Sequence, residues 1–174
     1  MNPFFDDPQL SYLSATDRRF VARFDEAMKA AGFPDGGRLG PGYCWGRHLV
    51  AYAKGRPGSE RQVARVYLRD DGITLRLYLS DLDKHRAYLE RASEAILAPF
   101  LAGFGDCVHC HNQRPDGTCK FRKSYTLFGY LTDKCNGLTF EYRTPAEADI
   151  PSYLALLAEF GLVQAEPGCI TTRL

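Results

Sequence analysis

The amino-acid sequence predicts an α+β fold, in which an antiparallel sheet carries helices on one face and a cysteine-bearing hairpin region adjoins it. Strand-like segments are grouped between helical ones, which favours α+β over a parallel doubly wound sheet. One strand-like segment also alternates strictly between apolar and polar residues, as a half-buried antiparallel strand does. Hydrophobic residues are 45% and charged residues 25% of the 174 positions, ordinary values for a globular core.

The first helix is predicted from Thr16 to Ala31, where apolar residues recur at helical spacing. Thr16 is the expected cap and Gly32 the expected stop. Residues 33–42 contain four glycines and two prolines and are expected to form a loop.

Three strands are expected next, over residues 43–54, 63–69 and 73–79. The pair Asp71-Gly72 between the last two predicts a tight hairpin turn with positive φ. In the third strand Ile73, Leu75, Leu77 and Leu79 face one way, and Thr74, Arg76 and Tyr78 face the other. One face of this sheet is therefore expected to be buried and the other wet or occupied.

A second helix is expected to start at Asp81 or Asp83 and to run through Leu97, with Pro99 bending or ending it. A hairpin around Gly129 and a strand over residues 138–142 follow.

The last helix is expected to start at Thr144-Pro145-Ala146-Glu147, read as cap, first-turn proline and capping-box glutamate. Gly161 is its expected stop. Its predicted apolar stripe consists of Ile150, Tyr153, Leu154, Leu157 and Phe160.

Four cysteines, Cys107, Cys110, Cys119 and Cys135, predict one structural zinc site. Two cysteines separated by two residues can aim both sulfurs at one ion, and zinc takes four tetrahedral thiolate or imidazole ligands. Hairpin strands between Phe121 and Lys134 would bring Cys135 back beside Cys119. Residues 106–116 are almost devoid of apolar side chains, so a metal would supply the free energy that orders them.

Alternatives to this ligand set stay open. His109 or His111 can replace one cysteine, because imidazole is an equally good zinc ligand. The cysteines can also be plain reduced thiols, or can hold an iron–sulfur cluster, although the wide spacing of the last two favours zinc. Cys44 and Cys169 are interpreted as small buried hydrophobes outside the site.

Five side chains form a possible ligand-binding face on the sheet: Arg65, Tyr67, Arg69, Arg76 and Tyr78. Trp45, Arg47 and His48 on the preceding strand would extend it. Such a basic and aromatic surface suits an anion, a nucleotide or an acidic peptide. The alternative, favoured by the general behaviour of amphipathic side chains, is a solvated face whose Arg and Tyr stems cover apolar surface.

The charge balance gives no global argument for nucleic acid, because 22 Lys+Arg against 21 Asp+Glu leave a net charge of +1. Arg122, Lys123 and Lys134, with aromatic residues between them, keep a nucleic-acid-binding zinc ribbon as an alternative. No stretch has the apolar length of a membrane span, and the N-terminus lacks the pattern of a signal peptide. A cytoplasmic location without membrane contact is therefore expected.

No arrangement of nucleophile, base and orienting group is found, and the acidic residues Asp81 and Asp83 at a strand-to-helix junction are interpreted as caps. The expected function is a zinc-binding, non-catalytic ligand-binding or interaction module, whose partner is a small anion or a protein. An enzyme with its site on the Arg/Tyr face is the other alternative. The expected organisation is an arm (1–15), an α+β core (16–104), a zinc-binding hairpin region packed on the core (105–143), and a C-terminal helix and tail (144–174).

Three segments carry a resemblance to an uncharacterised, cysteine-rich, zinc-ribbon-like family of bacterial proteins. They are Asp83-Lys84-His85-Arg86-Ala87-Tyr88-Leu89-Glu90, the cysteine pattern with Phe121-Arg122-Lys123-Ser124-Tyr125-Thr126, and Lys134-Cys135-Asn136-Gly137-Leu138-Thr139-Phe140. The resemblance spans most of the chain after about residue 15 and implies no particular activity. The order of helices and strands also resembles the YjbR/frataxin-like superfamily, which implies a helical layer on an antiparallel sheet.

Overall fold

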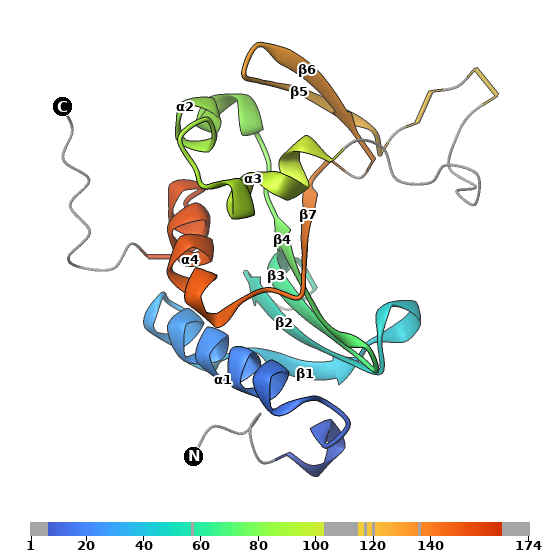
Figure 1. Cartoon of the computed structure of the whole chain (residues 1–174), viewed down its shortest axis with the longest axis vertical. Coiled ribbons are helices and arrows are strands. Elements are labelled where there is room, and N and C mark those ends of the chain that lie inside the picture. Colours follow the sequence, from blue (N-terminus) through green and yellow to red (C-terminus); the bar gives the residue numbers. More distant parts are fainter. Residues whose placement is uncertain are drawn as a thin grey trace. The chain divides into compact units, whose positions relative to one another are not determined.

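The computed structural model describes residues 7–56, 58–102, 115–116, 118–119, 121–135 and 137–164. Within these ranges the fold is α+β, with a five-stranded antiparallel sheet in the order β1-β2-β3-β4-β7, a two-stranded sheet β5-β6, and four α-helices (Figure 1). The chain divides into two compact units, which we call unit 1 (residues 1–77 and 141–174) and unit 2 (residues 78–140). Each unit is described by itself below.

The helices and strands of unit 1 come from both ends of the chain. They are η1 Pro8–Leu10, α1 Ala15–Ala30, β1 Arg38–Pro41, η2 Tyr43–Trp45, β2 His48–Lys54, β3 Arg61–Arg69, β4 Gly72–Tyr78, β7 Thr139–Arg143, η4 Glu147–Asp149 and α4 Ile150–Glu159, with β4 and β7 running into unit 2 at one end.

Helix α1 begins at Ala15, one residue before the predicted start, and its cap lies two residues before the predicted cap. Its cap is Ser14, whose hydroxyl accepts from the backbone N–H of Asp17 at 3.1 Å, so the prediction that Thr16 is the cap was wrong. Ser14 is the cap because its backbone is extended, as an N-cap requires. The predicted stop is confirmed, since Gly32 follows the helix with φ +103°, a conformation that favours glycine.

The segment after α1 contains a strand that the sequence did not indicate. β1 pairs antiparallel with β2 inside the stretch that was predicted to be a loop. The predicted strand from Tyr43 also begins late, because Tyr43–Trp45 form the 3-10 helix η2 and β2 starts at His48. The glycines and prolines of this stretch led to the loop prediction. An edge strand such as β1 tolerates these residues where a central strand does not.

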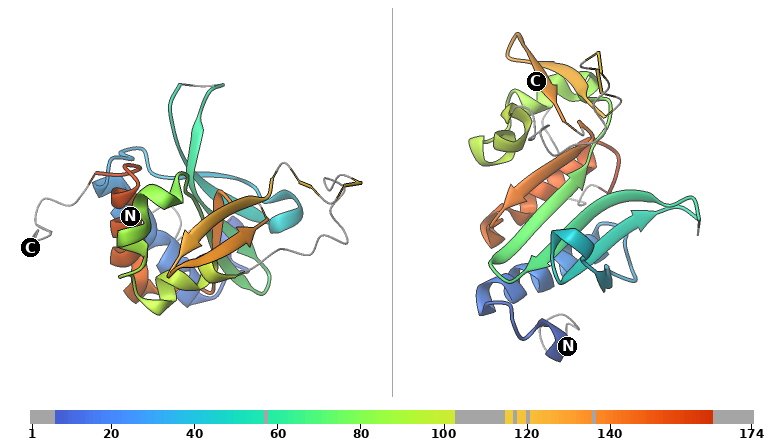
Figure 2. Two further views of the ribbon diagram at one scale, coloured as in Figure 1. Left: turned by 90° about the horizontal axis from the view of Figure 1, so that it is seen from above. Right: turned by 90° about the vertical axis from the view of Figure 1, so that its right-hand side faces the viewer.

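The β3–β4 hairpin is confirmed, but its turn lies one residue earlier than predicted. Arg69 pairs with Gly72, so Asp70 and Asp71 make the turn (Figure 2). The predicted alternation holds, because Ile73, Leu75 and Leu77 are at most 2% exposed. The other side of β4 is not simply wet, since Arg76 on it is only 7% exposed.

Helices α1 and α4 contact each other and lie side by side against the apolar side of the sheet in unit 1 (Figures 1 and 2). Phe24 of α1 meets Tyr52 of β2 edge to face, with ring centroids 5.5 Å apart. Tyr153 of α4 meets Tyr142 of β7, with centroids 4.8 Å apart. These aromatic contacts join the helices to the central and edge strands of the sheet.

One carboxylate is fully buried in this layer. Asp25 of α1 accepts from the Tyr52 hydroxyl at 3.1 Å and from the Gly37 backbone N–H at 2.7 Å, and it lies 2.8 Å from Lys29 Nζ. Burial, together with the Asp25 charge, raises the pKa of Tyr52 well above its usual value. Asp25 therefore ties α1 to β2 and to the loop before β1.

Helix α4 begins later than predicted. Thr144 has a left-handed backbone, with φ +47°, and Pro151 rather than Pro145 lies in the first turn of α4. The predicted cap at Thr144 was therefore wrong, because a positive φ is incompatible with the extended N-cap conformation. Leu156, not Leu154, joins the buried stripe, while Gly161 ends the helix with φ +65° as predicted.

Unit 2 contains the predicted hairpin around Gly129. The helix predicted before it is interrupted, although no interruption was expected. The elements of unit 2 are η3 Leu82–His85, α2 Arg86–Leu89, α3 Glu94–Leu101, β5 Lys123–Leu127 and β6 Tyr130–Lys134. The break falls before Ser93, which adopts the extended conformation of a helix cap, and Pro99 lies inside α3. The expectation of one helix ending at Pro99 was wrong, because a new helix starts at Ser93.

The described core of unit 2 contains an aromatic cluster among aliphatic side chains such as Leu79, Leu89 and Ile96. Phe100 and Phe140 stack with ring centroids 4.1 Å apart, and the Tyr125 hydroxyl donates to the Phe100 carbonyl at 2.5 Å. Burial raises the pKa of Tyr125 to about 12. Among the residues that the structure describes, no helix has the length and apolar character needed to cross a membrane.

Candidate functional site

Strand pairing in unit 1 places two arginines directly opposite each other. Arg65 of β3 faces Arg76 of β4 in the antiparallel register. Arg76 is 7% exposed and Arg65 is half-buried. Like charges at directly opposed positions destabilise a sheet, so this pair costs stability in the protein by itself.

The two guanidinium groups converge on one oxygen atom. Arg65 Nη1 lies 3.4 Å and Arg76 Nη1 lies 3.2 Å from the hydroxyl of Tyr67. A guanidinium can only donate, so both contacts use the Tyr67 oxygen as an acceptor and leave its proton for a third group. We call Arg65, Tyr67 and Arg76 the arginine-pair site.

Neighbouring polar groups complete the arginine-pair site. Arg76 Nη2 makes an ion pair with Glu141 of β7, and Arg65 Nε donates to the Gln62 side chain at 3.1 Å. Arg65, Arg76 and Glu141 together carry two positive charges and one negative charge. A small anion near the Tyr67 hydroxyl would bring this set to neutrality.

An indole ring borders the site. The guanidinium carbon of Arg76 lies 4.4 Å from the ring centre of Trp45 and 4.9 Å from that of Tyr67. Arg76 is thus held over two aromatic faces, an arrangement that stabilises a cation. Trp45 itself remains 48% exposed.

Two members of the predicted ligand-binding face do not join the arginine-pair site. Arg69 is exposed and donates to Asp71 at 2.9 Å, and this hydrogen bond lowers the pKa of Asp71. Tyr78 ends β4 and is the first residue of unit 2. Of the five predicted residues, the structure therefore gathers Arg65, Tyr67 and Arg76.

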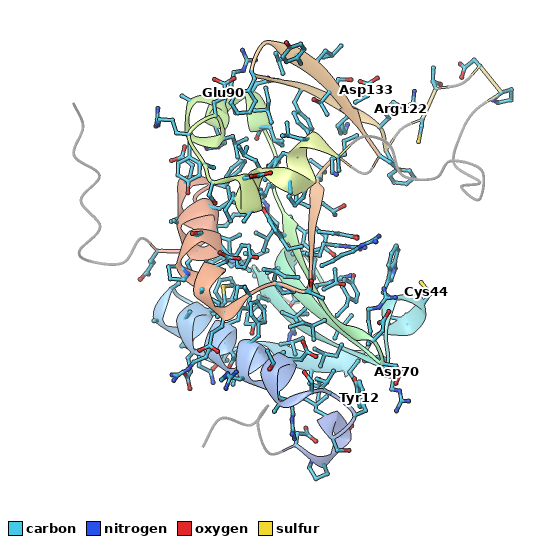
Figure 3. All side chains as sticks on the ribbon, in the orientation of Figure 1. Tyr12, Cys44, Asp70, Glu90, Arg122 and Asp133 are labelled. Atoms are coloured by element: carbon cyan, nitrogen blue, oxygen red, sulfur yellow. The ribbon has the colours of Figure 1, made fainter. Side chains whose placement is uncertain are left out.

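Two residues expected to extend the face form a separate cluster around Tyr12. The Tyr12 hydroxyl lies 3.0 Å from His48 Nδ1, and Arg47 covers the Tyr12 ring at 4.8 Å while pairing with Asp70 at 2.6 Å. Burial raises the pKa of Tyr12. Figure 3 labels Tyr12 and Asp70 at this end of unit 1, with Cys44 on the loop of η2. Of the three expected neighbours, only Trp45 contacts the arginine-pair site.

Sequence reasoning did not identify Gln62 or Glu141 as part of the site. Glu141 is the polar residue in an otherwise apolar and aromatic strand segment, which was a usable signal. The signal could not be used because the sequence does not say that β7 lies beside β4.

Only part of the predicted zinc site falls within the described residues, since Cys107, Cys110, His109 and His111 lie outside them. Cys119 and Cys135 are both half-buried. The β5–β6 pairing ends at Lys123 opposite Lys134, and Gly137 N–H donates to the Phe121 carbonyl at 3.4 Å. The hairpin thus returns Cys135 to the end at which the chain leaves Cys119. Within the described ranges, no group of three or more His, Cys, Asp or Glu residues could hold a metal ion.

Of the two remaining cysteines, one lies within the described residues and one outside them. Cys169 lies outside the described residues, whereas Cys44 is exposed on η2. The expectation that Cys44 is a buried hydrophobe was therefore wrong, because η2 turns this segment away from the core.

Comparisons with known proteins add no assignment to this geometry. No protein-family model matches the chain, and no significant match occurs among the curated proteins or the solved structures. The resemblance to a cysteine-rich bacterial family and to the frataxin-like topology stays a prediction.

Proposed function

We propose that unit 1 binds a small anionic ligand, without catalysing a reaction, at the arginine-pair site. The observation that supports this proposal is the convergence of Arg65 and Arg76 on the single hydroxyl oxygen of Tyr67. That oxygen occupies the position that an anionic oxygen prefers, between two guanidinium groups.

Physical chemistry favours a ligand over a purely structural role. Two arginines stand directly opposite each other, and one of them, Arg76, is buried together with the Tyr67 ring. Charge interactions are stronger there than in open water, so the repulsion is costly without an anion and the attraction is large with one. The competing interpretation, in which the arginine stems only cover apolar surface, accounts for the buried Tyr67 ring but not for a second guanidinium.

Titration calorimetry with inorganic phosphate and with acetate tests the proposal. Arg65→Gln removes one charged donor and is expected to weaken binding of the better anion by about tenfold, since a hydrogen bond to a charged group contributes about 1.5–3 kcal/mol. The control is Arg38→Gln, which removes an exposed arginine of the same sheet, one that pairs with Glu60 at 2.8 Å. Unchanged affinity in Arg65→Gln, or an equal loss in Arg38→Gln, would contradict an anion site at the arginine pair.

We also propose that Cys107, Cys110, Cys119 and Cys135 hold one structural zinc ion in a protein that works in the cytoplasm. The return of the β5–β6 hairpin toward Cys119 supports this proposal, since it supplies two of the four thiolates from one end of a hairpin. A closed four-thiolate site leaves no coordination position for water, so the metal would stabilise structure and not activate a nucleophile.

Elemental analysis of protein purified without added metal tests the zinc proposal. We expect one zinc per chain, lost in Cys119→Ser and retained in Cys44→Ser, whose side chain is exposed in unit 1. Metal-free protein with unchanged amide protection in β5 and β6 would show that the cysteines are plain thiols.

A further inference from the structure

We propose that the ligand of the arginine-pair site carries a planar aromatic ring that stacks on Trp45, as a nucleoside monophosphate does. This inference rests on the proposed anion site and narrows its ligand from any small anion to an anion joined to a ring. The observations that support it concern the loop that carries Trp45, residues 42–47.

Trp45 has an exposed aromatic surface beside the guanidinium group of Arg76. Arg76 covers one face of the indole at 4.4 Å, and the Tyr67 ring lies 6.2 Å away at an angle of 46°. Trp45 is nevertheless 48% exposed, so about half of its surface is accessible to a ligand. Aromatic side chains stack well on nucleobases, since every base has a flat π face.

The loop holds this ring in place by backbone hydrogen bonds. Gly42 N–H donates to the Arg47 carbonyl at 3.1 Å, Trp45 N–H donates to the Gly42 carbonyl at 3.1 Å, and Arg47 N–H donates to Leu68 at 2.9 Å. The loop is therefore closed on itself and anchored to β3. A preorganised ring loses little entropy when a ligand stacks on it.

Close packing of the loop backbone supports the same conclusion. A Cβ atom on Gly42 would lie 2.3 Å from the Gly46 carbonyl oxygen, and one on Gly46 would lie 2.6 Å from the Leu68 carbonyl oxygen. Both contacts are with backbone, which cannot move aside cheaply. The two glycines thus allow a tight loop that presents Trp45 at a defined position.

The loop also stores strain at a second exposed aromatic residue. Tyr43 has φ +53°, a conformation that bulky residues avoid, and is 82% exposed. Strain of this kind costs about 1–3 kcal/mol and tends to occur at ligand sites. An exposed tyrosine stabilises neither the apolar core nor the sheet. We therefore interpret the strained backbone at Tyr43 as part of the proposed ligand site.

The charged and the aromatic parts of the site are joined by one side chain. Arg76 contacts the Trp45 ring with its guanidinium carbon and the Tyr67 hydroxyl with Nη1. An anion held by Arg65, Arg76 and the Tyr67 proton is therefore one side chain away from the indole. In a nucleoside monophosphate the phosphate and the base are likewise separated by one group, the sugar.

The experiment compares AMP, ribose 5-phosphate and adenosine as calorimetric probes. Native protein is expected to bind AMP at least about fivefold more tightly than ribose 5-phosphate, which matches the lower range for base–aromatic stacking. Trp45→Leu should abolish this preference, by lowering the affinity for AMP more than the affinity for ribose 5-phosphate. Trp45→Phe, which keeps a ring, should retain part of the preference. Calorimetry is needed because Trp45 is the sole tryptophan, so these variants have no indole signal.

The outcomes separate this inference from the proposal beneath it. Equal affinities for AMP and ribose 5-phosphate in native protein would overturn the stacking inference and leave the anion site intact. An equal fall for both probes in Trp45→Leu would show that Trp45 only positions Arg76, which also overturns it. Adenosine binding as tightly as AMP, or no binding of any phosphate probe, would overturn the anion site and the inference with it.

Discussion

Unit 1 buries two charged side chains, Asp25 and Arg76, whereas in unit 2 the two carboxylates that bind the hairpin are exposed (Asp83) or half-buried (Glu90). In unit 1 each buried charge has specific polar partners, Tyr52, Gly37 and Lys29 for Asp25, and Tyr67 and Glu141 for Arg76. In unit 2 the described buried side chains are apolar or aromatic, apart from Thr139, and include the cluster of Phe100, Phe140 and Tyr125.

The carboxylates of unit 2 have a different task. Asp83 accepts from Thr126 N–H at 3.4 Å, and Glu90 accepts from Phe128 N–H at 2.7 Å. Thr126 lies in β5, and Phe128 lies in the turn that follows it. Capping them with acidic side chains protects an edge strand from pairing with another chain.

The comparison teaches where a ligand site is to be expected. A buried charge costs stability unless it is well paired, so a fold retains one where it has a use. Asp25 serves the architecture, because its partners tie a helix to a strand and a loop. Arg76 faces an opposed arginine and an exposed indole, and the proposed anion site rests on this arrangement.

The largest expected effect is on the apolar core of unit 2. Phe100→Ala removes a fully buried ring that stacks on Phe140 and should lower the free energy of unfolding of unit 2 by about 3–5 kcal/mol. Hydrogen exchange of the amides in β5 and β6 measures it. Leu101→Ala, at a 52% exposed neighbour, is the control. Equal loss of protection throughout β2 and β3 would show that the two units unfold together.

The next effect concerns the buried carboxylate of unit 1. Asp25→Ala leaves the Tyr52 hydroxyl and the Gly37 N–H without their acceptor and should cost about 2–4 kcal/mol, since each orphaned donor costs about 1–3. Urea unfolding measures it, with the exposed Asp35→Ala as control. A loss below about 1 kcal/mol would mean that Asp25 is not a structural tie.

The smallest effect is an alkaline one. The pKa of Tyr52 is raised in the folded protein, so above about pH 10 the unfolded chain loses the proton first and stability falls as pH rises. Burial also raises the pKa of Tyr125 in unit 2, but Tyr52 additionally faces the Asp25 charge. The alkaline loss of amide protection that comes from Tyr52 in unit 1 should therefore continue to higher pH than the loss that comes from Tyr125 in unit 2. Tyr52→Phe should flatten the slope in unit 1, and an unchanged slope there would contradict this account.

Several elements could be predicted from local patterns. The alternation in β4, the hairpin around Gly129 and the glycine stops of α1 and α4 depend on neighbouring residues only, and the structure has them. Element starts were predicted less well, because the conformation at Ser14, Ser93 and Thr144 depends on how the flanking segments are held.

For the candidate site, the residue types and their alternation along β3 and β4 were sufficient to place Arg65, Tyr67 and Arg76 on one face. What the sequence by itself determined is this face, because side-chain direction in a strand follows from a period of two. Only the tertiary structure decided that Glu141 pairs with Arg76, that Trp45 lies over Arg76, and that Asp25 is sealed beneath Tyr52. Those contacts join residues far apart in the chain, and they form only when strand order and loop closure bring them together.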